Sequence, residues 1–306
     1  MKAPDTMPPH HARSRAWLLL LLVALLLGGM AWGLSHVYQE REQRYRHQIE
    51  GSLQAVNQLQ LRAVTDWRAR RMAEAAALTQ DSLFARAVAQ WRGAPSSPQQ
   101  AALRERLTIL MEQVRYTAAY LVDAQGRLLL DAQGAATGQL PEPEQQALQL
   151  ALAQARPVVV ELRRDPAFAF AFYGLIAPLF DGTRALGAVW LLVDARATLY
   201  PLLETWPNHS PTAESVLVQR SGDEVVSLSP LPLRGSESGA LRLPLVQGGR
   251  DPMAMAATGV RGAFYAHDYR GQEVLAVASA VADSPWLLLS KVDVGDAFTD
   301  AQRREW

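Results

Sequence analysis

An unbroken apolar run near the N-terminus constrains this chain more than any other feature. Residues 16–34 read AWLLLLLVALLLGGMAWGL and contain no charged residue. A helix needs about 20 such residues to cross the hydrocarbon core of a bilayer, and the tryptophans near both ends of the run suit the membrane interface. We therefore predict a transmembrane helix over residues 16–36. The alternatives are a signal peptide, whose apolar region is normally shorter, and a core helix, which is seldom apolar on every face.

The orientation of this helix depends on the residues around it. Three basic residues precede the run and three follow it closely, namely Lys2, Arg13, Arg15, Arg41, Arg44 and Arg46. Because these counts balance and long domains translocate largely regardless of charge, the flanking residues do not decide the orientation. We predict a cytoplasmic tail over residues 1–15 and a periplasmic main domain, in a single-pass protein of a bacterial inner membrane.

Composition excludes several function classes for the remaining residues. Hydrophobic residues make up 49% of the chain and charged residues 20%, which is typical of a globular domain. The formal net charge of +0 gives no basis for nucleic-acid binding. The absence of cysteine rules out disulfides, thiolate zinc sites and a cysteine nucleophile. No two histidines lie four residues apart, and no phosphate-binding loop, dinucleotide fingerprint or GxSxG motif occurs. We predict no metal, no cofactor and no enzymatic activity within this chain.

A helical segment follows the membrane run and fills most of residues 37–118. From Tyr38 to Trp91 there is no proline and a single glycine, and apolar residues from Tyr45 to Trp67 recur every three or four positions. This pattern predicts one continuous helix from Tyr45 to Trp91, a loop at residues 93–98 and a second helix to about Arg115. The apolar stripe could pack on the chain's own sheet or against a second subunit, and we predict a homodimer through this helix.

The pattern then changes to the period of two that is typical of strands, and one order of elements occurs twice. The first set comprises strands at residues 119–123 and 127–131, a helix at 142–155, and strands at 158–163, 167–179 and 184–194. The second set comprises strands at 214–220 and 224–228, a helix at 251–258, and strands at 262–268, 272–281 and 286–292. This predicts an internal duplication, with a first module at 119–195, a linker helix within 196–213, a second module at 214–293 and a closing helix at 294–306. His267 and Asp268 could form half of a catalytic triad, but a hairpin turn is the simpler explanation, because aspartate favours turns.

This arrangement resembles the double Cache sensor region of bacterial transmembrane receptors, in which two PAS-like modules follow a long helix. LYPLLETWPNHSPTAESVLVQRSGDEVVSLSPL at 199–231 resembles the entry to the second module, and HDYRGQEVLAVASAVADSPWLLLSKVDVGDAF at 267–298 resembles its last strands. The resemblance implies an α+β fold and a ligand-sensing role in a receptor of the sensor-kinase or diguanylate-cyclase type. It also implies a second membrane span and an output module, so we expect the sequence to be a fragment that stops before them.

The resemblance further implies that a small molecule binds in the membrane-distal module, which is the first module by order. A carboxylate ligand would need guanidinium donors and aromatic walls. The candidates near the expected pocket are Trp67, Arg71, Arg115, Tyr116, Arg163 and Tyr173. Structural roles compete for several residues, namely core packing for Trp67, a solvated strand end for Arg163 and a buried strand face for Phe168, Phe170 and Phe172. The full tyrosine, arginine, tryptophan and aspartate pattern of amino-acid-binding members cannot be located, so the ligand stays open.

Two other function classes remain open at this stage. A membrane-tethered extracytoplasmic enzyme would need a convergent cluster of titratable residues in a pocket. A scaffold would bind a protein partner through the second module. The lipid bilayer is a predicted partner in every case.

Overall fold

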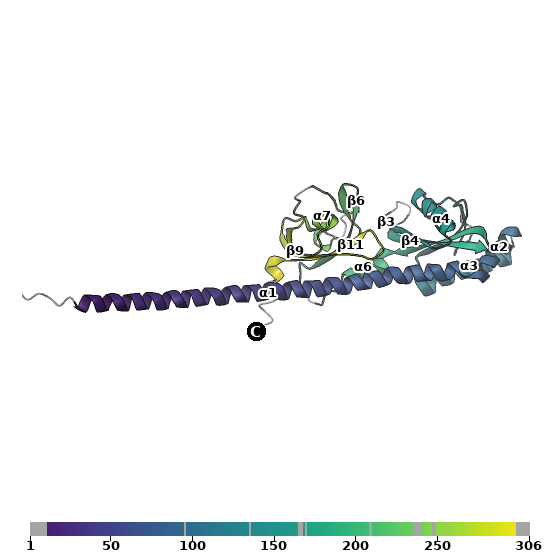
Figure 1. The fold of residues 1–306 in the computed structure, drawn as a ribbon. Coiled ribbons are helices and arrows are strands. Elements are labelled where there is room, and N and C mark those ends of the chain that lie inside the picture. Colours follow the sequence, from purple (N-terminus) through teal and green to yellow (C-terminus); the bar gives the residue numbers. More distant parts are fainter. Residues whose placement is uncertain are drawn as a thin grey trace, which may run out of the picture. The chain divides into compact units, whose positions relative to one another are not determined.

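In the computed structural model, the described residues are 11–94, 96–134, 136–164, 168, 170–207, 210–235, 240–246 and 249–297. Residues 53–296 form one compact unit, and residues 1–52 with 297–306 form a second unit. Helix α1 (His11–Thr79) begins in the second of these and continues into the first. Both sheets and all remaining helices belong to the compact unit (Figure 1).

The helical segment before the sheets consists of α1, α2 (Ser82–Gly93) and α3 (Ser97–Val114). The prediction of one continuous helix to Trp91 was therefore wrong. The side chain of Asp81 accepts hydrogen bonds from the backbone N–H groups of Leu83 at 3.1 Å and Phe84 at 3.0 Å. Such an N-cap satisfies the free donors of a new helix, so α2 starts independently after a short break.

The first module is a five-stranded antiparallel sheet in the order β2-β1-β5-β4-β3. Its elements are β1 (Ala118–Asp123), β2 (Leu128–Asp131), α4 (Glu142–Gln154), β3 (Val158–Arg164), β4 (Ala171–Asp181) and β5 (Arg184–Asp194). The predicted sequence of two strands, a helix and three strands is confirmed. Strand β4 begins four residues later than the expected position 167.

The linker between the modules contains two single-turn helices, α5 (Ala195–Thr198) and α6 (Tyr200–Leu203). The single helix expected after Ala195 is therefore absent from the described residues of this segment. Pro201 lies in the first turn of α6, where its missing N–H cannot continue the hydrogen bonding of a preceding helix. Because the helix must restart there, two short turns replace one helix.

The second module is a six-stranded antiparallel sheet in the order β8-β7-β6-β11-β10-β9. Its elements are β6 (Glu214–Ser221), β7 (Glu224–Ser227), η1 (Pro232–Arg234), β8 (Arg242–Pro244), α7 (Pro252–Ala257), β9 (Gly262–His267), β10 (Glu273–Ala280) and β11 (Trp286–Asp293). Apart from the added edge strand β8, which was not predicted, this order repeats that of the first sheet. The duplication and the α+β class are thus confirmed.

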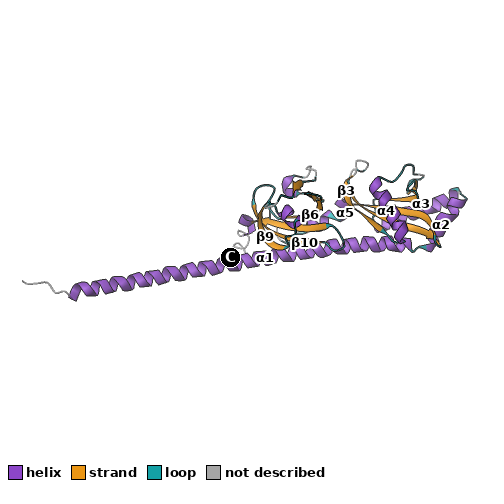
Figure 2. Cartoon of the chain, turned by 45° about the horizontal axis from the view of Figure 1, so that its top comes forward, coloured by secondary structure: helices purple, strands orange, loops and turns teal. Residues whose placement is uncertain are grey.

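Three apolar clusters cover the two faces of each sheet. The cluster beneath α1 joins both modules, because it contains Trp67 of α1, Leu191 of β5 and Leu288 of β11. A second cluster lies between the first sheet and α4, and a third lies between the second sheet and α7. Figures 1 and 2 show α1 along one face of both sheets and α4 over the other face of the first sheet. The first sheet is therefore a middle layer between α1 and α4.

A close backbone approach fixes the pairing of β1 with β5. Gly187 has a φ of +136° and pairs with Asp123. A Cβ atom at this position would lie 2.0 Å from the carbonyl oxygen of Val122. Only glycine fits there, because any side chain would collide with fixed backbone.

The predicted membrane helix lies in the backbone of α1, but most side chains of residues 16–36 are outside the described residues. Within the described part of the chain, no helix combines the length and the apolar character needed to cross a membrane. Of the closing helix expected at 294–306, residues 294–297 are helical and the rest lies outside the description.

Candidate functional site

Two of the predicted site residues meet on the α1 face of the first sheet. Trp67 of α1 and Tyr173 of β4 are 4% and 1% exposed, and their ring centroids lie 5.0 Å apart. The ring of Tyr173 also lies 5.8 Å from that of Trp286 in β11. Burial raises the pKa of the Tyr173 phenol well above its usual value. This pair belongs to the core that joins the two modules.

Arg71 and Tyr116 meet on the same face through a shared carboxylate. The Nη1 atom of Arg71 lies 2.9 Å from Oε2 of Glu74 and donates a 2.6 Å hydrogen bond to the carbonyl oxygen of Val114. The hydroxyl of Tyr116 donates to the same Glu74 oxygen at 2.9 Å. Burial and the neighbouring Glu74 raise the pKa of Tyr116. Arg115 is not part of this group, since it is exposed and ends α3 with a φ of +59°.

Arg163 lies on the opposite, α4 face of the sheet. Its Nη2 atom donates to both carboxylate oxygens of Glu144, at 2.8 and 2.9 Å. Glu144 is fully buried in the first turn of α4, whereas the Arg163 side chain is 27% exposed. A shift in the pairing of β3 with β4 between Val160 and Arg163 accompanies this change of face. The six predicted residues therefore do not form one site.

The α4 face also carries a group of aromatic rings. The ring of Phe168 lies 5.0 Å from that of Phe172 and 6.0 Å from that of Trp190, and Tyr120 lies 5.2 Å from Trp190. Phe172 is fully buried, as expected for a buried strand face, whereas Phe168 and Phe170 are half-buried and precede β4. Trp190 is 3% exposed, and its indole N–H has no hydrogen-bond partner within the described structure. The indole N–H groups of Trp67 and Trp286, in the core beneath α1, also have no partner within the described structure, so this feature does not by itself distinguish the α4 face.

The sequence analysis missed Glu144 and Trp190. Glu144 is one of four glutamates or glutamines in the first five residues of α4, and nothing local separates it from its more exposed neighbours. Trp190 lies within a continuous apolar strand, and that pattern indicates only that the residue is buried. Only the packing of α4 on the first sheet brings Glu144 to Arg163, and only the strand pairing brings Trp190 to the other aromatic rings.

Arg68 connects the two modules and was also missed. Its guanidinium binds Glu161 of β3 with both Nη atoms, at 3.0 and 3.1 Å, and donates to the carbonyl oxygen of Asp283 at 3.1 Å. Its Cζ atom lies 4.3 Å from the ring centre of Trp286 and 5.3 Å from that of Tyr173. Glu161 and Tyr173 belong to the first module, and Asp283 and Trp286 to the second. One side chain of α1 therefore contacts both sheets.

Two buried amides of α1 fix this helix on the second module. The Nδ2 atom of Asn57 donates to Oγ of Ser290 at 3.0 Å. The Nε2 atom of Gln60 donates to the carbonyl oxygen of Leu203 at 2.9 Å, and Oγ of Ser215 donates to its Oε1 at 2.6 Å. Buried amides require such partners, so a sliding movement of α1 along the sheet would break several hydrogen bonds together.

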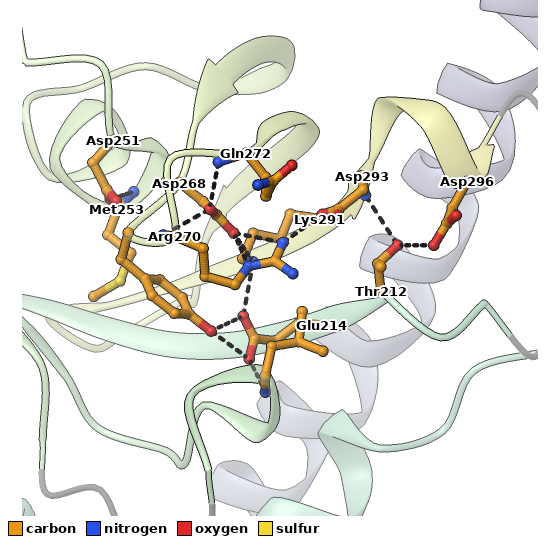
Figure 3. Close-up of polar contacts among 12 residues, drawn as sticks. Thr212, Glu214, Asp251, Met253, Asp268, Arg270, Gln272, Lys291, Asp293 and Asp296 are labelled. Carbon is orange, nitrogen blue, oxygen red and sulfur yellow. Dashed lines mark hydrogen bonds and ion pairs between the residues drawn. The ribbon is translucent and has the colours of Figure 1, made fainter.

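A buried ionic network occupies the second module, between its sheet and the chain before α7 (Figure 3). Lys291 is 1% exposed, and its Nζ atom lies 2.9 Å from Glu214 and 2.6 Å from Asp268. The hydroxyl of Tyr269 lies 3.1 Å from both oxygens of Glu214. Arg270 contacts Asp268 at 2.8 Å and also binds Asp293.

This network controls the ionisation of Asp268. Burial by itself would raise the pKa of Asp268, but the hydrogen bonds from Lys291 and Arg270 outweigh it and hold the pKa below its usual value. Asp268 also accepts hydrogen bonds from the backbone N–H groups of Arg270 and Gln272, so the expected turn is confirmed.

Asp251, beside this network, ionises less readily. Its Oδ1 atom accepts the N–H of Met253 at 2.8 Å and caps α7, while its buried Oδ2 atom has no partner among the described atoms. Burial raises the pKa of Asp251 to about 6, and the nearby Asp268 adds to the effect. No cluster of three possible metal ligands occurs in the described residues.

Comparison with known proteins identifies the fold. No family model matches the sequence, and no curated protein matches it either.

The sensory domain of the Campylobacter jejuni chemoreceptor Tlp3 with isoleucine bound aligns with a TM-score of 0.58 at 11% identity, over 83% of this chain and 96% of that one. The ligand-binding domain of the Pseudomonas aeruginosa PAO1 amino-acid chemoreceptor PctB, in complex with L-Arg, aligns with a TM-score of 0.55 at 16% identity, over 82% and 98%. That of Pseudomonas fluorescens CtaA with L-serine aligns with a TM-score of 0.53 at 13% identity, over 81% and 98%. The chain therefore has the double Cache fold that the sequence predicted.

Proposed function

We propose that this chain, which has the fold of chemoreceptor ligand-binding domains, is the extracytoplasmic ligand-sensing region of a membrane-bound signalling receptor. The observation that carries the proposal is the two-module architecture on one shared helix, which extends over almost the whole of those sensory domains. A duplicated sheet on a common helix suits signal transfer, because a change in one module alters the contacts of a helix that the other module also holds.

The proposed ligand site is the α4 face of the first module. The partly exposed guanidinium of Arg163 is a donor for a carboxylate, and the unpartnered N–H of Trp190 is a second. Phe168 and Phe170 supply apolar walls. We propose a small carboxylate-bearing molecule, with amino acids as the first candidates, since the structural neighbours bind them. The α1 face of the same sheet would then be stabilised by Trp67, Arg71, Tyr116 and Tyr173.

The conformational change caused by the ligand would pass from the first module to the second through Arg68. A ligand shifts a conformational equilibrium only by the difference in its affinity for the two states. Movement of β3 on ligand binding would change the position of Glu161 and hence of Arg68, which also holds the turn at Asp283. The second module and α1 would carry that change toward the membrane.

The proposal includes a membrane anchor over residues 16–36 and a homodimer. Leu25, Leu27, Met30 and Trp32 are 63–71% exposed, which supports an apolar environment outside the chain. In the stripe of α1, Leu53, Val56 and Trp67 are buried by the chain itself, whereas Leu59 is 57% exposed. The dimer would therefore use the outer side of the helix. A strict monomer in sedimentation of the full chain would contradict it.

A ligand screen tests the sensing role. The melting temperature of the full chain should rise with one class among amino acids, organic acids and amines, because a ligand that binds only the native state stabilises it. Trp190→Phe, which removes the indole N–H and keeps an aromatic ring, should weaken the effect of that ligand. Trp91→Phe is the matched control in α2 and should leave it unchanged. A complete lack of shift would contradict the proposal.

The two rival classes give different results. A membrane-tethered enzyme would turn over members of a hydrolase substrate panel, whereas we propose that the chain itself catalyses no reaction. A protein-binding scaffold would respond to neither the ligands nor the substrates.

A further inference from the structure

A cavity lies where the linker meets the second module, away from the proposed ligand site. It has a volume of about 200 Å³. The described residues that line it come from the linker, the start of β6 and the segment after β7, namely Tyr200, Leu203, Glu204, Trp206, Ala213, Glu214, Ser215, Ser229, Pro230 and Pro232. For comparison, a cavity of about 150 Å³ in another protein holds benzene. This cavity is therefore large enough for a small organic molecule.

The charge of its lining is negative. Glu204 and Glu214 are its two charged residues, and none of its described lining residues is basic. Glu204 is exposed and has no ion-pair partner in the described structure. The carboxylate of Glu214 is buried and bound by Lys291 and Tyr269, and it belongs to a network in which three carboxylates share the two cations Lys291 and Arg270, so Glu204 supplies the accessible charge. Such a lining repels an anion and attracts a cation.

The uncharged part of the lining suits an organic cation better than a hydrated metal ion. Its aromatic lining residues are the buried Tyr200 and the half-buried Trp206, and Pro230 and Pro232 are among its apolar ones. Indole and phenol faces attract alkylammonium groups, which bring apolar atoms and a diffuse positive charge together. Carboxylates and aromatic rings around one cavity are the usual elements of an ammonium site.

We propose that this cavity is a second ligand site, which takes a small organic ammonium ion between Trp206 and Glu204. The site differs from the first-module site in its place and in the charge that it selects. Because α6 and Trp206 belong to the linker between the modules, a bound cation would hold that linker against the second sheet.

Choline is a suitable probe, and 3,3-dimethylbutan-1-ol is its neutral isostere. Isothermal titration of the full chain should show saturable binding of choline in the millimolar range or tighter, and the neutral alcohol should bind at least about fivefold more weakly. Glu204→Gln keeps the shape of an exposed side chain and should weaken choline binding about two- to fivefold. Glu273→Gln is the matched control, since it removes an exposed carboxylate of the same module that does not line this cavity.

The outcomes separate this site from the first-module site. Choline binding that persists in Trp190→Phe and weakens in Glu204→Gln alone supports the proposal, whatever the amino-acid screen shows. Absence of saturable binding, equal binding of the neutral alcohol, or an equal loss in Glu273→Gln overturns it. Loss of choline binding in Trp190→Phe also overturns it, because the cation would then occupy the first module.

Discussion

Arg68 of α1 binds Glu161 of β3 through two parallel hydrogen bonds, at 3.0 and 3.1 Å, although 93 residues separate them in the sequence. The Arg68 side chain is 8% exposed and that of Glu161 is 32% exposed. A planar guanidinium matches the two oxygens of a carboxylate, so the pair is directional as well as charged. The same guanidinium stacks on Trp286 of the second module. This pair therefore connects the stability of the first sheet to that of the second.

We predict that Arg68→Lys lowers the free energy of unfolding by about 1–3 kcal/mol, because lysine keeps the charge but loses the bidentate geometry and the ring stacking. Calorimetry should then resolve two transitions in place of one, as the modules unfold separately. Arg70→Lys, on the exposed side of the same helix, is the control and should leave one transition. A single unchanged transition in Arg68→Lys would show that the apolar core alone couples the modules.

Lys291→Met should destabilise the second module by about 3–5 kcal/mol, because it leaves Glu214 and Asp268 buried without their shared cation. Denaturant unfolding measures the loss. The triple variant that adds Glu214→Gln and Asp268→Asn removes the unpaired charges and should recover part of this stability. If Lys291→Met costs as little as an exposed substitution, the network contributes little to folding.

Asp251→Asn should stabilise the protein near neutral pH. The folded pKa of Asp251 is raised to about 6 from 3.8, so its ionisation opposes folding. The stability that this raised pKa provides is complete below about pH 4 and is lost as the pH rises through about 6. The loss amounts to about 1–3 kcal/mol at pH 8. Asparagine caps helices as well as aspartate does. The two proteins should have equal stability at pH 4 and differ at pH 8, and a constant difference across this range would contradict the assignment.

Gly187→Ala should cost about 2 kcal/mol or more, since its Cβ would meet the carbonyl oxygen of Val122 and the strand would have to move. Hydrogen exchange of the β1 amides should increase with this loss. Gly182→Ala is the comparison, because Gly182 has a φ of +62° and open space around it. It should cost about 1 kcal/mol from backbone conformation alone. Equal effects in the two variants would exclude the close approach as the cause.

Much of the fold was predictable from local patterns. The short apolar segments between Ala118 and Asp194 and between Glu214 and Asp293 indicate strands. The central strands β5 and β11 are buried along most of their length, because helices cover both faces of each sheet. Equal element order in the two halves predicted the duplicated sheets. The break at Asp81 was missed, since a good helix-forming sequence continues through it and only the cap marks a new start.

The candidate site was predictable in part. Trp67 and Arg71 lie four residues apart on α1 and share a buried face, as their spacing predicted. Arg163 and Tyr173 were grouped as one site, yet they lie on opposite faces of the first sheet. The shift in β-pairing after Val160 changes which side chains point to which layer, and no local pattern records it.

The sequence by itself determined the apolar N-terminal run, the two modules and their element order, because each depends on the spacing of apolar residues along a short segment. Only the tertiary structure decided the partners of Arg68, the Glu144–Arg163 pair and the burial of Lys291 among carboxylates. The hydrogen bonds among those contacts join residues between 19 and 215 positions apart. They depend on strand register and on the layer that each face meets, and both are set by the packing of the whole compact unit.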